Sequence, residues 1–524
     1  MMNLDPKPML DTHKPLREAM EAALRSLQEL TGNRNSSNQF AETIRDVGVF
    51  GDLVAAQHFR NLLLARSNSR SARKMERLPG LNLSAAHREG LERIVNDLDA
   101  AIAEHLKEEA ARYGLRPASD LRRVLLLIGH LPPITWMGAH TRQICSYAAA
   151  LAMSPDTEAL RVVATQESAP ENFLFMESEV EQNDVAGWRT ELDSVAGGTC
   201  PKVEFVTPDR LGRVRPYEAS LKAACEFRPD VVLAFQGNYA SRVLPKVLHA
   251  YVPIVAVQFN QINPEPSYAD LVLAHGLRHS FKDKPTPEIW RDHRIPLVPF
   301  AKKLSTSQED LVPQAQLRLI TALSMGRLER TLLLNEAADL RLVISFLERW
   351  PDAAWLLVGI AEPEQYRATL DPPLPEPVRD RVRFMRPVPD LRAIYEHCHI
   401  YMHLPAMAGG GMGMAMAIAE GIPVLAKYGT DAANFIDEDL LYRDSAEAWE
   451  RVERWAGDEL LRRHVVERQQ RRLDRDHSLN AVSHSIRSVI AEALERFHHT
   501  DEIERDRRRM SDESSLPTGE FSAS

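Results

Sequence analysis

Two loops, one in each half of the chain, carry residue types that suit chemistry on a substrate. In the first half, His130 and His140 belong to the stretch GHLPPITWMGAHTRQ, which lies between an apolar run and a helical one. Imidazole is the usual general base near neutral pH, so His140, where the helical run begins, is the candidate catalytic residue. The alternative for both histidines is a capping or packing role.

The second loop is rich in glycine and lies in PAMAGGGMGMAMAIAEGIPVLA. Of only 24 glycines in the chain, this stretch gathers Gly409, Gly410, Gly411 and Gly413 between a predicted strand and a predicted helix. Glycine lets the backbone approach a phosphate, and the first amides of a helix are unpaired donors, so a diphosphate fits here. The spacing matches neither a P-loop nor a dinucleotide fingerprint. The alternative is a tight turn before a small-residue helix packed on its sheet.

Other polar groups give weaker signals. Arg327 and Arg330 follow a predicted strand and could supply cations to a phosphate, although surface arginines are common. The histidines and the cysteine between residues 397 and 403 lack a carboxylate at ligand spacing, so we predict no metal site. The basic run 468–476 also carries acids, which favours a solvated helix face over a nucleic-acid patch.

Hydrophobic periodicity divides the chain into three regimes. Residues 1 to about 118 are predicted to be helical, with apolar positions at three- and four-residue spacing. Short apolar runs alternating with helical stretches follow, which is the pattern of a parallel sheet covered on both faces. Strands are predicted at residues 124–129, 160–165, 203–206, 230–235, 253–259 and 270–275, with helices at 140–153 and 217–227.

A second α/β series begins after a proline- and charge-rich stretch at about 282–313. Its strands are predicted at residues 318–326, 353–359, 381–385, 399–404 and 423–429, with helices at 332–350 and 411–421. The predicted fold class is therefore α/β, with two Rossmann-like domains at 119–300 and 314–480, a helical region at 1–118, and a terminal helix with a disordered tail at 481–524. Ligands of such sheets bind beyond the carboxyl ends of the strands, so the cleft between the domains is the expected site.

Composition excludes several classes of protein. The chain has 524 residues, 44% of them hydrophobic, and a net charge of −10, which argues against a disordered chain, a fibre and a basic polyanion binder. Its four cysteines form no CxxC pair and are expected to be buried thiols. We find neither a secretory signal nor a membrane span, and expect a cytoplasmic protein.

Three stretches resemble a known enzyme family. YEHCHIYMHLPAMAGGGMG, GTDAANFIDEDLLY and PIVAVQFNQINPEPSYADLVLAH are similar to segments of GT-B glycosyltransferases, and specifically of the family that joins O-linked N-acetylglucosamine transferase with the bacterial adhesin N-glucosyltransferases. The resemblance spans residues 120–480. It implies transfer of a sugar from a nucleotide sugar, usually UDP-linked, to Asn, Ser or Thr of a polypeptide, without metal or resident cofactor.

The resemblance also implies roles for particular residues. His140 matches the family's active-site histidine, and Arg327 or Arg330 stands near its diphosphate-binding lysine. Where the family offers a polar residue and a ribose-binding Asp, this chain has Met412 and Met416, and methionine is a poor hydrogen-bond acceptor. Asp431 is the candidate that could hold the ribose instead.

These departures keep two alternatives open. The first is a catalytically silent GT-B relative that acts as a scaffold, with an oligomer or protein partner contact through its helical N-terminal region. The second is another nucleotide-sugar enzyme of the same shape, such as a 2-epimerase.

Overall fold

The computed structural model describes most of the two α/β series and part of the helical region that precedes them. The described residues are 14–31, 52–67, 85–115, 121–129, 131, 139–165, 184–207, 216–236, 241–258, 268–274, 286–292, 294–298, 312–322, 338–370, 373–388, 391–404 and 411–514. Everything said below about structure concerns these residues.

The strands form two sheets, one in each half of the chain, and every pairing in them is parallel. The sheet of the N-terminal domain has the order β3 (Val203–Val206), β2 (Ala159–Ala164), β1 (Arg123–Ile128), β4 (Val231–Phe235), β5 (Ile254–Val257), β6 (Leu271–Ala274) and β7 (Trp290–Asp292). The sheet of the C-terminal domain has the order β10 (Val382–Met385), β9 (Ala353–Val358), β8 (Leu317–Ala322), β11 (Ile400–Met402) and β12 (Val424–Leu425). Two doubly wound sheets confirm the predicted α/β class.

The strands β4, β5, β6 and β9 are apolar along their whole length because helices cover both faces of each sheet. On one face of the N-terminal sheet lie α6 (Ala139–Met153), α7 (Val185–Ala196) and the first half of α19 (Leu479–Ser514). On the other face lie α8 (Pro216–Phe227), α9 (Val243–Leu248) and α5 (Ala85–Arg112). Val231 and Leu233 of β4 face the first group, and Val232 faces the second, as strand geometry requires.

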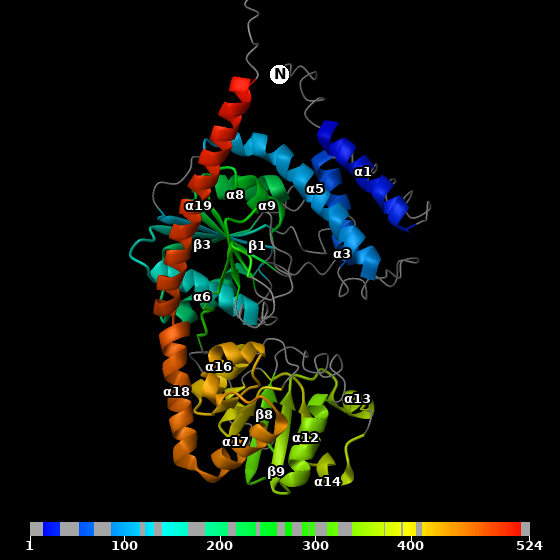
Figure 1. Ribbon diagram of the computed structural model, residues 1–524, viewed down its shortest axis with the longest axis vertical. Coiled ribbons are helices and arrows are strands. Elements are labelled where there is room, and N and C mark those ends of the chain that lie inside the picture. Colours follow the sequence, from blue (N-terminus) through cyan, green and yellow to red (C-terminus); the bar gives the residue numbers. More distant parts are fainter. Residues whose placement is uncertain are drawn as a thin grey trace, which may run out of the picture.

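The predicted N-terminal helices are α1 (Lys14–Thr31), α3 (Asp52–Ser67) and α5, which pack together beside the N-terminal domain (Figure 1). Their apolar residues belong to the same core as one face of that domain's sheet. Inside this core, Arg60 of α3 donates to Asp99 of α5 at 2.6 Å, and both side chains are fully buried. Arg242, just before α9, contacts the same carboxylate at 3.1 Å, so charge pairing fixes the helical region to the domain.

One core fills the C-terminal domain. Around its sheet lie α12 (Ala338–Arg349), α13 (Pro363–Ala368), α14 (Glu376–Arg379), α15 (Arg392–Tyr395), α16 (Gly411–Ala419), α17 (Ser445–Gly457) and α18 (Glu459–His477), with the short 3-10 helices η3 (Asp431–Phe435) and η4 (Glu438–Leu440). Phe346 of α12 meets Trp355 of β9 edge to face and packs at a tilt on Trp449 of α17, which joins two helices to the sheet.

The chain returns to its first domain at the end. Figure 1 shows α18 running along the C-terminal domain and α19 running on along the N-terminal domain, where it contacts α6. The helix of this C-terminal region continues to Ser514. The repeated apolar residues at helical spacing (Val482, Ile486, Ile490 and Ala493) are buried and hold the first half of the helix on the domain.

The four cysteines carry free thiols; Cys145, Cys200 and Cys225 are buried and Cys398 is half-buried. Burial, with nearby carboxylates, raises the pKa of Cys225 to about 12. Within the described ranges, none of the helices has the length and hydrophobicity of a membrane span.

Candidate active site

The glycine-rich segment opens α16, which follows β11 at the carboxyl edge of the C-terminal sheet. Gly411 and Gly413 lie in its first turn, whereas Gly409 and Gly410 lie outside the described residues. In Figure 1, α16 lies on the side of the C-terminal domain that faces the N-terminal domain. The first amides of a helix are unpaired donors, so the start of α16 is a candidate anion site.

Close packing explains Gly411, whereas Gly413 has ordinary contact distances around it. A methyl group added at Gly411 would lie 3.1 Å and 3.2 Å from two ring carbons of Phe435. One added at Gly413 would lie 3.4 Å from the carbonyl oxygen of Ala322, at the end of β8, and 3.5 Å from the hydroxyls of Tyr395 and Tyr401. The alternative interpretation, a small-residue helix packed on its sheet, therefore accounts for the glycine at position 411.

Two buried tyrosines fix the start of α16. Tyr395 donates its hydroxyl hydrogen to the carbonyl of Gly413 at 2.9 Å, and Tyr401 donates to the carbonyl of Ala322 at 2.9 Å. Burial raises the pKa of both hydroxyls, so they remain protonated donors at any physiological pH. Neither residue was predicted as part of the site, because nothing in the spacing of the sequence links them to the glycines.

The methionines of α16 are core residues in this structure. Met412 is 6% exposed and Met416 is 4% exposed, and both belong to the core of the C-terminal domain. Every residue type along this helix is Gly, Ala, Met or Ile, so α16 presents backbone groups rather than polar side chains. Asp431 begins η3, and η3 contacts α16. The structure describes the backbone of Asp431 but not its side chain.

In the N-terminal domain α6 follows β1, and its second residue is His140. Its side-chain position, like Arg327, Arg330 and His130, lies outside the described residues. Two residues further on, Arg142 is buried, donates to the carbonyl of Val298 at 2.8 Å and pairs with Glu191. Burial lowers the pKa of Arg142, Glu191 raises it again, and Arg392 of the C-terminal domain lowers it further.

The two chain segments that cross between the domains lie side by side next to α16. Leu297 donates its amide hydrogen to the carbonyl of His477 at 3.0 Å, and Nδ1 of His477 donates to the carbonyl of Ile295 at 2.8 Å. The His477 ring also packs on Phe435, with 4.9 Å between ring centres. Because Phe435 lies against Gly411, the two crossing segments are connected through Phe435 to the first turn of α16.

The basic run on α18 is used in ion pairs. Arg468 bonds Asp439 at 2.8 and 2.9 Å and Asp437 at 3.2 Å, and Arg472 bonds Asp437 at 2.8 Å. Hydrogen bonds from Arg468 lower the pKa of Asp439. The run thus anchors the η3–η4 segment, which contains Asp431.

The His and Cys residues at 397–403 serve separate structural roles. His399 accepts a hydrogen bond at Nδ1 from the amide of Arg318 at 3.1 Å, and burial lowers its pKa, helped by Arg318 and Arg462. His397 lies 3.4 Å from Glu396, and His403 is fully buried at the end of β11. The described residues contain no group of three or more His, Cys, Asp or Glu that could hold a metal ion.

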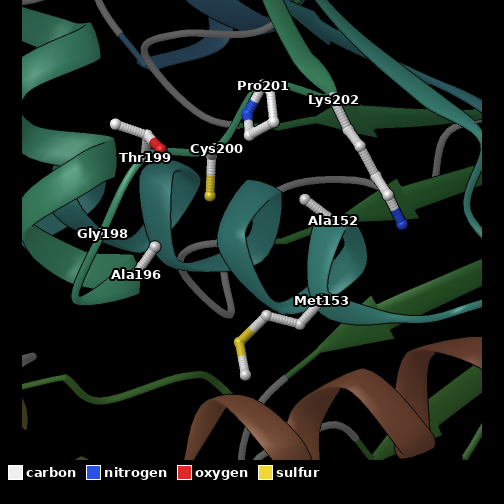
Figure 2. Close-up of a pocket in the computed structure, with 8 residues that line it drawn as sticks. All are labelled: Ala152, Met153, Ala196, Gly198, Thr199, Cys200, Pro201 and Lys202. Carbon is white, nitrogen blue, oxygen red and sulfur yellow. The ribbon is translucent and has the colours of Figure 1, made fainter.

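A small cavity of about 210 Å³ lies away from this region (Figure 2). It is lined by the last two residues of α6, Ala152 and Met153, and by the turn that leads from α7 to β3, including Cys200 and Lys202. Since these residues lie where α6 and α7 end and β3 begins, the cavity is at the amino edge of the sheet. It is therefore separate from the carboxyl edges of the sheets, where the candidate site is expected.

Comparisons with known proteins agree with this geometry. Residues 330–488 match a family model described as glycosyl transferase-like. No curated protein matches the chain. The family match within the C-terminal domain and the fold of two α/β domains agree with the predicted distant resemblance to GT-B glycosyltransferases.

Among solved structures, the chain is similar to a mutant O-GlcNAc transferase from Thermobaculum terrenum. The TM-score is 0.51 at 13% identity, over 93% of this chain and 99% of that one. It also matches a glycosyltransferase from Rickettsia africae, with a TM-score of 0.49 at 11% identity over 71% and 98% of the two chains. A sucrose-phosphate synthase from Thermosynechococcus elongatus matches with a TM-score of 0.45 at 13% identity over 71% and 98%. At these identities, the likeness to the first structure shows the fold.

Proposed function

We propose that the protein transfers a sugar from a nucleotide-sugar donor, UDP-linked, to a protein or peptide acceptor without a metal ion. The observation that carries this proposal is the pairing of two helix starts at the carboxyl edges of the two sheets. One is the backbone-lined start of α16, and the other is the start of α6 with His140. A diphosphate suits the first, and a proton acceptor suits the second.

In the proposed reaction, an acceptor oxygen or nitrogen attacks the anomeric carbon of the sugar. The bond from that carbon to the diphosphate oxygen breaks, the acceptor's proton passes to His140, and the nucleoside diphosphate leaves. The first amides of α16, together with Arg327 or Arg330, stabilise the charge that develops on the leaving diphosphate. Asp431 is the proposed ribose ligand.

The first test is isothermal titration calorimetry against UDP and GDP and then against their sugar conjugates. We expect saturable binding that weakens about ten- to hundredfold when Arg327 and Arg330 are changed to Ala, because each cation is lost from a charge-assisted contact. His140→Ala should abolish transfer at saturating donor while leaving donor binding intact. Transfer that survives in this variant would exclude His140 as the base.

The second candidate is a silent GT-B relative that acts as a scaffold. It is favoured by one observation, namely that Met412 and Met416 are packed in the core and offer no polar group to a ribose. No binding at millimolar nucleotide would support this candidate over the transferase. Sugar interconversion with no acceptor present would instead indicate an epimerase.

A further inference from the structure

A buried amide at the carboxyl edge of the N-terminal sheet has no hydrogen-bond partner. Gln258 directly follows β5, and its side chain is 4% exposed. Neither Oε1 nor Nε2 of this side chain forms a hydrogen bond with any residue that the structure describes. Buried polar side chains are nearly always paired, because a desolvated donor or acceptor without a partner is costly.

The neighbouring strand provides the contrast. Phe235 of β4 pairs with Val257 of β5, so the next residues, Gln236 and Gln258, lie side by side at the ends of the two strands. Gln236 is also buried, but its Nε2 donates to the hydroxyl of Tyr268 at 2.9 Å and to the carbonyl of Ala234 at 3.1 Å. The fold therefore satisfies one of two adjacent glutamines and leaves the other open.

The backbone fixes the open amide at the edge where ligands bind. The backbone N–H of Gln258 donates to the carbonyl of Leu273 at 2.8 Å, which ties this residue's backbone to β6. The carboxyl edge of a doubly wound sheet binds ligands near the point where the strand order reverses, here between β1 and β4, one strand away. In the first turn of α6, which follows β1, the hydroxyl of Thr141 is likewise buried without a partner.

We infer that Gln258 binds two adjacent hydroxyls of the sugar that is transferred, and so helps to select that sugar. A carboxamide presents one acceptor and one donor side by side. One sugar hydroxyl donates to Oε1 and its neighbour accepts from Nε2, which satisfies both unpaired atoms at once. This inference rests on the proposed function, because the sugar arrives on a nucleotide donor.

The test compares wild type and Gln258→Leu in calorimetric titrations with UDP and with UDP-glucose. Leu keeps the volume but removes both polar atoms. We expect equal affinity for UDP, and a loss of about ten- to hundredfold in affinity for UDP-glucose in the variant. Deoxy analogues of UDP-glucose should bind wild type less tightly than the parent, and the analogue that lacks a contacted hydroxyl should lose less in Gln258→Leu.

Gln236→Leu is the matched control, since it removes the paired glutamine at the same level of the sheet. Gln236→Leu should lower the thermal unfolding temperature. It should leave unchanged the ratio of the affinities for UDP-glucose and UDP. Gln258→Leu should leave that temperature unchanged or raise it, because no internal hydrogen bond is lost. A lowered temperature with equal glucose affinity in wild type and Gln258→Leu would show a structural role and overturn the inference.

The two proposals fail differently. If wild type does not bind UDP, the proposed function fails and the inference falls with it. If UDP binds, but the ratio of the affinities for UDP-glucose and UDP is the same in wild type and Gln258→Leu, the inference alone is wrong.

Discussion

The starts of α6 and α16 each follow a strand next to the point where the strand order reverses, β1 in one sheet and β11 in the other, yet they are built in opposite ways. The residues from His140 to Gln143 of α6 are all polar, and Arg142 binds Glu191 and the carbonyl of Val298. The first residues of α16 alternate glycine and methionine, and polar contact there comes from outside the helix, through the hydroxyl of Tyr395.

This difference fits a division of labour in sugar transfer. A base or an orienting group must be a side chain with a particular pKa, whereas a diphosphate can be held by backbone amides and a helix dipole. Side chains would block close approach to those amides. The comparison therefore predicts that the N-terminal side is sensitive to changes in polar groups, and the C-terminal side to changes in volume.

The largest effect on stability is expected for Arg142→Met. Glu191, whose side chain is 12% exposed, would lose its charge partner, and the carbonyl of Val298 would lose a donor. Breaking a buried pair from one side destabilises by about 3–5 kcal/mol, which guanidinium unfolding of the full chain can measure. The double variant Arg142→Met, Glu191→Gln should recover much of this loss. If it is as unstable as the single variant, the bond to Val298, and not the charge pair, dominates.

A smaller effect on stability is expected at the start of α16, where Gly411 and Gly413 differ in how closely they are packed. Gly411→Ala must displace the ring of Phe435, which is itself packed against His477, so we expect a loss of about 1–3 kcal/mol. Gly413→Ala meets only ordinary contact distances and should gain up to about 1 kcal/mol from helix propensity.

Thermal unfolding and UDP titration of both glycine variants test this contrast. If Gly413→Ala is stable but no longer binds UDP, the glycine serves close approach of the ligand. If both variants are equally unstable, the packing argument for Gly411 is wrong.

Most elements could be predicted because buried parallel strands appear in the sequence as short apolar runs. The run at 124–129 became β1, and the run at 353–359 became β9. Errors fell at ends of elements. The run at 423–429 gave only the two residues of β12, and Lys427 beyond it forms a single bridge to Tyr442.

The candidate site was harder to predict, because its fixed contacts join residues far apart in sequence. Arg142 meets Val298, and His477 meets Ile295, across 156 and 182 residues, and no spacing rule connects such pairs. The unpaired amide of Gln258 is a property of the folded sheet alone. The glycine cluster could be singled out from the sequence because its glycines are close together in the chain.

The smallest expected effect concerns how the η3–η4 segment is held beside α16. Arg468 lowers the pKa of Asp439, so the pair stabilises the folded state above the carboxyl's ordinary pKa. That contribution is lost as the pH falls through the lowered pKa, where the carboxyl becomes protonated in the folded state too. Because Asp439 is well exposed, Arg468→Gln should cost less than about 1 kcal/mol near neutral pH.

Unfolding temperatures of wild type and Arg468→Gln, followed between about pH 3 and about pH 7, should therefore converge on the acid side. The difference should also shrink at high salt, since solvent screens an exposed pair. Arg463→Gln is the matched control on the same helix, where Arg463 pairs with exposed Glu459 one turn away and not with the η3–η4 segment. If both variants respond alike to pH, the ion pairs to Asp437 and Asp439 add nothing beyond ordinary surface charge, and packing alone positions the segment.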